Sequence, residues 1–155
     1  MIRPRPRPVL DEASKRLIEE LQQDGRRSYT ALGQAVGLSE AAVRQRVQRL
    51  VDTRVIQIVA VTDPLHVGFT RQAMIGLRVD GDPVEVAERL AAVAEIDYVV
   101  ITAGSFDILL EVVCEDDDHL LRLISESIRS DPAVRASETF VYLRLAKQTY
   151  SWGTR

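Results

Sequence analysis

The sequence predicts an α+β protein with a helical N-terminal domain and a C-terminal domain in which strands and helices alternate. Two observations lead to this prediction. Between residues 10 and 54, apolar residues recur at helical spacing in three short runs separated by turn-forming residues. From residue 70 onward, short β-rich runs and helical runs follow the order β-α-β-β-α-β. The chain of 155 residues is long enough for two small domains, each with its own core.

The N-terminal runs predict three helices. The first begins after Asp11, a residue type that caps helices well. A tight break at residues 37–39, Gly-Leu-Ser, separates a short second helix from a third helix expected from about Glu40 to Val51. Three short helices joined by such breaks are typical of DNA-binding domains. We therefore predict a winged-type helix-turn-helix domain over residues 10–54.

The third helix has a polar face that is suited to DNA. Val43, Val47 and Leu50 are spaced to form its buried stripe, which leaves arginines and glutamines on the opposite side. In the major groove, Arg pairs with guanine and Gln with adenine. The residues expected at DNA are Ser39, Glu40, Ala41, Arg44, Gln45, Arg46, Gln48 and Arg49. An ordinary basic amphipathic helix with a solvated face remains the alternative.

Two of these residues have a second possible role. Ser39, at the start of the helix, can cap it or contact a phosphate, because the exposed amides there favour anions. Arg46 lies nearer the buried flank of the helix, so a phosphate contact or a structural salt bridge is expected of it rather than base recognition.

Charge is distributed unevenly along the chain. The formal net charge is −3, yet residues 1–60 hold 11 Lys and Arg against 7 Asp and Glu, a balance of +4, and residues 61–155 hold 9 against 16, a balance of −7. Because polyanions bind local basic patches, only the front half is expected to meet phosphate. Residues 1–9 alternate Arg and Pro and predict an extended arm, either a solvated tail or a basic arm on DNA.

The C-terminal pattern predicts a ferredoxin-like βαββαβ domain over residues 70–148, with a four-stranded antiparallel sheet and both helices on one face. A linker strand and turn over residues 55–69 precedes it, and a tail over residues 149–155 follows. The expected strands are Met74–Val79, Tyr98–Thr102, Asp107–Cys114 and Thr139–Leu145. One expected helix begins at Asp82-Pro83, and the other spans Asp116–Arg129.

The strand that ends at Cys114 indicates self-association. Ile108, Leu110 and Val112 share one face of this strand with the cysteine, while Leu109, Glu111 and Val113 lie on the other face. Apolar residues on both faces predict that the side without helices is also covered, and a second subunit is the simplest cover.

A set of short motifs, in order along the chain, carries a family resemblance. The motifs are Leu10-Asp11, Leu17-Ile18, Leu21-Gln22-Gln23-Asp24-Gly25-Arg26, Val36-Gly37-Leu38-Ser39, Val43, Arg46-Val47, Leu50, Val55-Ile56, Asp63-Pro64, Gly68, Ala103-Gly104-Ser105-Phe106-Asp107-Ile108, Thr139, Val141, Leu143 and Lys147. With them the chain resembles the Lrp/AsnC, or feast/famine, transcriptional regulators over roughly residues 10–148.

The resemblance implies a double-stranded DNA partner, a homodimer formed through the sheet, and larger rings such as octamers. It also implies an amino acid or related small molecule bound at contacts between dimers. The residues that carry over to that effector site are Gly104, Ser105, Phe106, Asp107 and Thr139. Two positions depart from the family pattern: Ser14 stands where an acid is usual, and Phe106 replaces the commoner Tyr, which removes a hydroxyl.

The chemistry of the loop can be assessed apart from the resemblance. Gly104 permits a positive φ and close approach of a ligand, and an ionised Asp107 can accept hydrogen bonds from an ammonium group. A hairpin turn with a capping Asp is the equally open alternative.

Other classes of function find little support. A single cysteine excludes an internal disulfide and any metal site built from several cysteines. The acidic run 115–118 lacks the spacing of a calcium loop. We therefore expect neither a metal ion nor another cofactor. No catalytic constellation is present, which indicates a protein that is not an enzyme. An N-terminus without an apolar signal region and the lack of a membrane-length apolar run predict a cytoplasmic protein without a membrane partner.

The predicted function is a sequence-specific transcriptional regulator that responds to a small molecule. Three alternatives stay open: an effector-independent architectural DNA-binding protein, a small ferredoxin-like enzyme, and an interaction adaptor with a degenerate helix-turn-helix.

Overall fold

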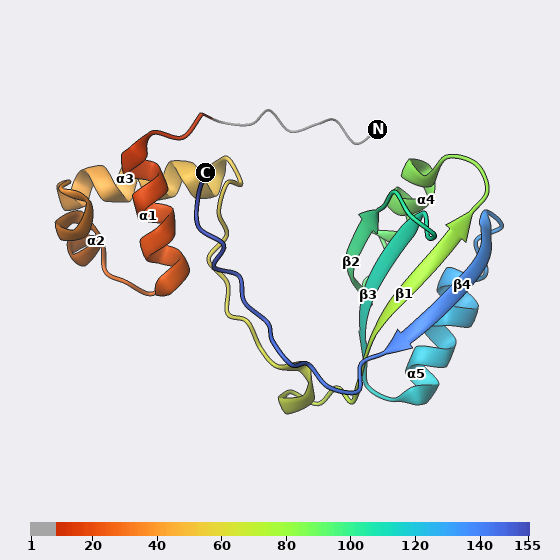
Figure 1. Ribbon diagram of the computed structural model, residues 1–155. Coiled ribbons are helices and arrows are strands. Elements are labelled where there is room, and N and C mark those ends of the chain that lie inside the picture. The colour runs from red at the N-terminus through yellow and green to blue at the C-terminus, as the bar shows by residue number, and fades with distance from the viewer. Residues whose placement is uncertain (1–8) are drawn as a thin grey trace. The chain divides into compact units, whose positions relative to one another are not determined.

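The computed structural model describes residues 9–155 (Figure 1). These residues form two compact units, a helical unit of residues 9–61 joined by residues 146–155 and a sheet unit of Thr62–Leu145. The Arg-Pro arm expected over residues 1–9 lies, except for Val9, outside the described residues.

The helical unit contains the three expected helices. They are α1 (Glu12–Gln23), α2 (Tyr29–Val36) and α3 (Glu40–Asp52). Each begins with a side-chain cap, because Asp11, Ser28 and Ser39 accept hydrogen bonds from the backbone amides of residues 14, 31 and 42. Leu17 and Val43 lie at 0% exposure in the core between the helices.

The turn between α2 and α3 depends on two glycines. Gly37 ends α2 at φ +73°, in the left-handed region that favours glycine. Gly33, inside α2, lies against the carbonyl oxygen of Leu38, and a Cβ at this position would come within 2.5 Å of that oxygen. The turn can therefore fold back on α2 only if residue 33 has no side chain.

Helix α3 ends in a Schellman motif. The Val55 amide donates to the Leu50 carbonyl and the Arg54 amide to the Val51 carbonyl, both at 2.9 Å. Arg54 has φ +56° where glycine is usual. Beyond it, residues 55–63 form no strand, so the expected linker strand is wrong. Their β-branched side chains favour extended backbone, but an extended segment becomes a strand only when it pairs in a ladder.

The sheet unit is an antiparallel sheet in the order β2-β3-β1-β4 with its helices packed on one face (Figure 1). Its elements are η1 (Pro64–His66), β1 (Arg71–Val79), α4 (Pro83–Leu90), β2 (Ile96–Ile101), β3 (Ile108–Cys114), α5 (Asp117–Arg122), η2 (Leu123–Ile128) and β4 (Val134–Val141). This is the predicted ferredoxin-like arrangement.

Strands β1 and β2 begin three and two residues earlier than expected, and two further elements differ more. The last strand runs from Val134 to Val141 instead of Thr139 to Leu145, because its first residues pair with the end of β1 despite their polar sequence. The expected helix Asp116–Arg129 is α-helical only to Arg122 and continues as the π-helix η2.

Strand β3 alternates as predicted. Ile108, Leu110, Val112 and Cys114 are fully buried against the helices, and the residues between them are half-buried on the opposite face. The sheet therefore has one face packed on helices and one open face.

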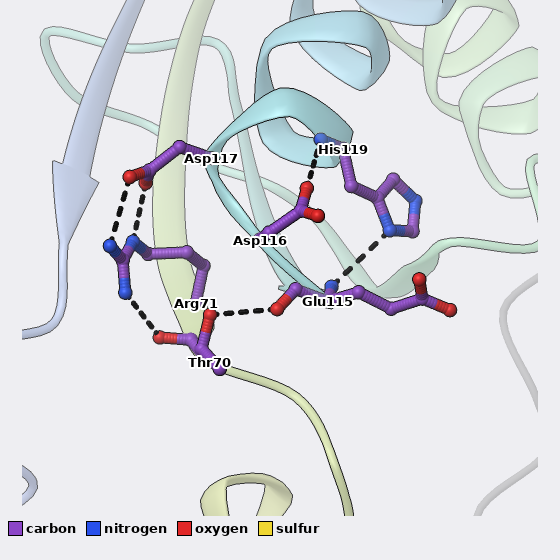
Figure 2. A network of polar contacts seen from close by, with 6 residues as sticks. All are labelled: Thr70, Arg71, Glu115, Asp116, Asp117 and His119. Atoms are coloured by element: carbon purple, nitrogen blue, oxygen red, sulfur yellow. Dashed lines mark hydrogen bonds and ion pairs between the residues drawn. The ribbon is translucent and has the colours of Figure 1, made fainter.

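The acidic run after β3 fixes the start of α5 (Figure 2). Asp116 caps the helix through the His119 amide at 2.7 Å, and Asp117 forms a bidentate ion pair with Arg71 of β1. The Thr70 hydroxyl donates to the Glu115 carbonyl at 2.7 Å. Within residues 9–155, no group of three or more His, Cys, Asp or Glu side chains is placed to hold a metal ion.

The C-terminal tail belongs to the helical unit. The Gly153 amide donates to Gln22 Oε1 at 3.1 Å, and the Thr154 hydroxyl donates to Glu19 Oε1 at 2.6 Å. Both acceptors lie on α1. Trp152 remains 75% exposed, so it does not pack within the chain. Among the described helices, none is long and apolar enough to cross a membrane.

Candidate nucleic-acid interface and effector loop

A shallow, open hollow of about 600 Å³ lies along the outer face of α3. Its lining residues are Ala41, Arg44, Gln45, Gln48, Arg49 and Asp52. The first five were expected at DNA from the sequence, and α3 brings them together because they recur on the side opposite its buried stripe of Val43, Val47 and Leu50. All five are exposed. Small Ala41 leaves room for close approach.

Asp52 was not among the residues predicted to meet DNA. Gln48 Nε2 donates to Asp52 Oδ1 at 2.8 Å, one helical turn further along. The i, i+4 spacing of an amide and a carboxylate is the signal that could have revealed this pair. The Gln48 carbonyl oxygen is left out of this hydrogen bond, and rotation of the side chain would release the amide group for a base edge.

Arg44 is held in place by its neighbours. Its Nη2 lies 3.0 Å from Glu40 Oε1, and its guanidinium carbon lies 4.9 Å from the centroid of the Tyr29 ring. Glu40 Oε2 also accepts a hydrogen bond from the Thr30 hydroxyl at 2.8 Å. The hydrogen bonds from Thr30 and then Arg44 lower the pKa of Glu40, so its carboxylate is charged at neutral pH.

Arg46 has a structural partner. Its Nη1 lies 2.6 Å from Asp11 Oδ2 and 3.2 Å from Ser14 Oγ, which ties α3 to the start of α1. The hydrogen bonds from Ser14 and Arg46 lower the pKa of Asp11 to about 2. Ser14, which departs from the family pattern, is buried and accepts from Arg46, so it joins α1 to α3. The salt bridge expected as one role of Arg46 is present.

Ser39 also performs the structural part of its expected role. Its hydroxyl accepts from the Ala42 amide at 3.3 Å, which caps α3. Because the oxygen is the acceptor in this bond and the residue is exposed, its O–H group can still donate to a phosphate.

The predicted effector loop lies between β2 and β3. Gly104 and Ser105 are exposed, and Phe106 and Asp107 are half-buried. Gly104 does not adopt the positive φ that a glycine permits. Asp107 Oδ2 accepts from the Val79 amide at 2.9 Å, so this carboxylate joins the loop to β1, and its other oxygen lies outside that bond.

Phe106 lies on the open face of the sheet. Its ring covers Gly76, where a Cβ would come within 2.6 Å of it, and meets Phe140 edge-on at a centroid distance of 6.1 Å. The Arg78 guanidinium lies 5.4 Å from the ring, and its Nε donates to the Ser105 carbonyl at 3.0 Å. These three partners could not be predicted from the sequence, because each comes from a strand distant in sequence.

Thr139 does not join this group. It is paired with Ile75, whose side chain faces the helices, whereas Phe140 is paired with Met74 on the open face. Within one chain the sheet therefore separates Thr139 from Phe106.

Comparisons with known proteins cover both units. Residues 10–51 match the AsnC-type helix-turn-helix domain, and residues 69–155 match a C-terminal dimeric alpha+beta barrel domain of the AsnC regulators. An HTH-type transcriptional regulator of Pyrococcus furiosus is 31% identical over 145 residues, 92% of this chain and 98% of the relative. The proline dehydrogenase transcriptional activator of Rhizobium radiobacter is 30% identical over 145 residues, 90% of this chain and 93% of that protein.

Solved structures with the same fold include two close matches in shape. The leucine response regulatory protein LrpA of Mycobacterium tuberculosis has a TM-score of 0.81 at 27% identity, covering 90% of this chain and 96% of that one. A Neisseria meningitidis transcriptional regulator in complex with L-Met has a TM-score of 0.79 at 24% identity, covering 92% and 96%.

The helix-turn-helix unit and the α+β unit together define a DNA-binding transcriptional regulator with a dimeric type of C-terminal domain. The chain belongs to the Lrp/AsnC family of such regulators.

Proposed function

We propose that the chain is a sequence-specific regulator that places α3 in the major groove, with Arg44, Gln45, Gln48 and Arg49 facing the bases. The exposed Arg/Gln face of α3 carries this proposal, since these side chains line one hollow and offer donors and acceptors that match base edges. Two copies paired through the open sheet face would present two such helices to a pseudo-palindromic site.

The test of the DNA-binding face begins with sites selected from random double-stranded DNA by the full chain. Affinity for the selected site is then measured with Arg44→Ala and Gln48→Ala, and with Gln34→Ala as a control on the exposed side of α2. We expect each α3 variant to lose about 5- to 150-fold in affinity for this site, the range of one good base contact, with the control unchanged. Wild-type affinity in both α3 variants would overturn the proposed face.

We further propose that a free amino acid or related small molecule binds beside the loop of Gly104, Ser105, Phe106 and Asp107 and alters assembly or DNA affinity. The exposed backbone of residues 104 and 105 and the oxygen of Asp107 that the Val79 amide leaves unused suit the two charged groups of such a ligand. The L-Met complex of the Neisseria regulator supports this by likeness of fold. Because the sheet separates Thr139 from this loop within one chain, only the Thr139 of another subunit could contact the ligand.

Calorimetric titration of the full chain with the common amino acids, followed by DNA binding with each ligand present, tests this second proposal. At least one amino acid is expected to bind and to change the DNA affinity, because an effector must bind two assembly states differently. The absence of heat and of any change in DNA affinity with every amino acid would instead favour an effector-independent architectural protein.

A further inference from the structure

Gln48 and Asp52 contact one another on the outer face of α3, one helical turn apart. Gln48 Nε2 donates to Asp52 Oδ1 at 2.8 Å, and both exposed side chains line the hollow on this helix. An ionised carboxylate has only acceptors, whereas an amide has a donor end and an acceptor end. The nitrogen end of Gln48 therefore faces Asp52, and its carbonyl oxygen does not.

The position of Asp52 is unfavourable both for the helix and for binding of a polyanion. Asp52 is the last residue of α3, where the helix dipole favours cations over carboxylates. On a surface that meets DNA, its charge also repels the phosphates. The contact that offsets these costs is its hydrogen bond with Gln48.

The orientation that Asp52 imposes on Gln48 fits adenine. In the major groove, adenine offers a donor, the N6 amino group, beside an acceptor, N7. The carbonyl oxygen of Gln48 would accept from N6, and its amide nitrogen would donate to N7. That nitrogen carries two hydrogens, so one can stay on Asp52 while the other meets N7. Adenine can therefore be bound without loss of the hydrogen bond within the protein.

Guanine does not fit the same orientation. Its major-groove edge offers two acceptors, N7 and O6, so the carbonyl oxygen of Gln48 would face an acceptor. If the amide turns over to bring its donor end to O6, the carbonyl oxygen lies against the Asp52 carboxylate instead, and the hydrogen bond at 2.8 Å is lost. This cost applies to the guanine complex and not to the adenine complex, and such a difference between partners is what specificity requires.

We propose that Asp52 is a specificity-determining residue, which holds the amide of Gln48 in the orientation that accepts adenine and rejects guanine at one base pair of the site. Asp52 acts through Gln48 as a positioning residue and needs no contact of its own with DNA. This inference rests on the proposed sequence-specific DNA binding by α3.

Asp52→Asn in the full chain tests this role, because an amide at residue 52 can donate or accept and so satisfies either orientation of Gln48. The base pair read by Gln48 is first located in the selected site, as the pair whose replacement lowers the affinity of the wild type but not that of Gln48→Ala. Affinity is then measured for DNAs with adenine or guanine at that position. We expect the wild type to prefer adenine, and Asp52→Asn to reduce this preference about two- to tenfold, the range of one net hydrogen bond.

Two controls separate orientation from charge. Removal of a carboxylate strengthens binding to both DNAs, but the ratio of two DNAs of equal charge does not register this effect. Glu12→Gln removes an exposed carboxylate of α1 whose partner is Lys15, and it should leave the ratio unchanged. In the background of Gln48→Ala, Asp52→Asn should also leave the ratio unchanged, because the amide that Asp52 orients is gone.

The same ratio of adenine to guanine affinity in Asp52→Asn and in the wild type would overturn the role of Asp52 while leaving DNA binding by α3 intact. A wild-type preference for another base at that position, or an effect of Asp52→Asn that persists without Gln48, would also overturn it. If no base pair of the selected site is read differently by Gln48→Ala and by the wild type, the proposed contact of Gln48 with a base fails together with this inference.

Discussion

Arg46 lies on the helix expected at DNA, yet its charge is paired within the protein. From the sequence it was suited to a phosphate or to a salt bridge, and no local pattern distinguished the two. Its partner Asp11 is 35 residues away, and only the packing of α3 across α1 brings the charges to 2.6 Å. By contrast, Arg44, Gln45, Gln48 and Arg49 follow from helical spacing alone, because the buried stripe fixes the face that they occupy.

The pairing of Asp11 predicts a pH dependence of stability. Its pKa in the folded chain is about 2, below the ordinary 3.8, so the ionised carboxylate stabilises the fold above about pH 3.8 and this contribution is lost as pH falls through 2. Asp11→Asn keeps the capping oxygen but removes the charge. In urea unfolding between pH 5 and 2, the wild type should lose more stability than the variant on acidification. Parallel pH profiles would contradict this role.

Helix α2 shows what element-level prediction misses. Its start at Ser28 and its end at Gly37 follow from capping preferences. The glycine at position 33 looks like a poor helix residue, and only the return of the chain at Leu38 explains it. In the sheet unit, the π-helical hydrogen bonds of η2 likewise leave no distinct periodicity over six residues.

Gly33→Ala should therefore damage the turn between α2 and α3. The added Cβ would come within 2.5 Å of the Leu38 carbonyl oxygen, so the backbone must shift, at a cost of about 1–3 kcal/mol or more. Gly25→Ala is the control, because its Cβ would meet atoms no closer than 3.7 Å. Thermal unfolding and affinity for the selected DNA measure the effect. Equal melting temperatures for the two variants would show that the contact at residue 33 is unimportant.

At the scale of the whole molecule, the existence of an open sheet face could be predicted from the sequence, but the side-chain contacts on that face could not. Alternation in β3 predicted apolar residues on both faces, and the structure confirms a face without helices that carries Tyr98, Leu109 and Phe140. The cluster of Phe106 on Gly76 could not be predicted, since it joins a loop to two strands through contacts that have no sequence signature.

This face is expected to form the dimer. Tyr98 and Leu121 are both 62% exposed, the first on the open face and the second on α5. Tyr98→Glu replaces an exposed aromatic ring by a second carboxylate beside Glu111 and should weaken dimerisation at least about tenfold, whereas Leu121→Glu should not. Sedimentation velocity over a range of concentrations distinguishes them. A Tyr98→Glu chain that remains as dimeric as the wild type would place the interface elsewhere.

Hydroxyl-radical footprinting of the wild-type chain on its selected DNA site tests the central claim most directly, because it locates α3 on the duplex. We predict two protected half-sites about one helical turn apart, each lost or strongly weakened in Arg44→Ala and in Gln48→Ala. The same footprint in the wild type and in both variants, or protection without paired half-sites, would contradict recognition of DNA by paired α3 helices.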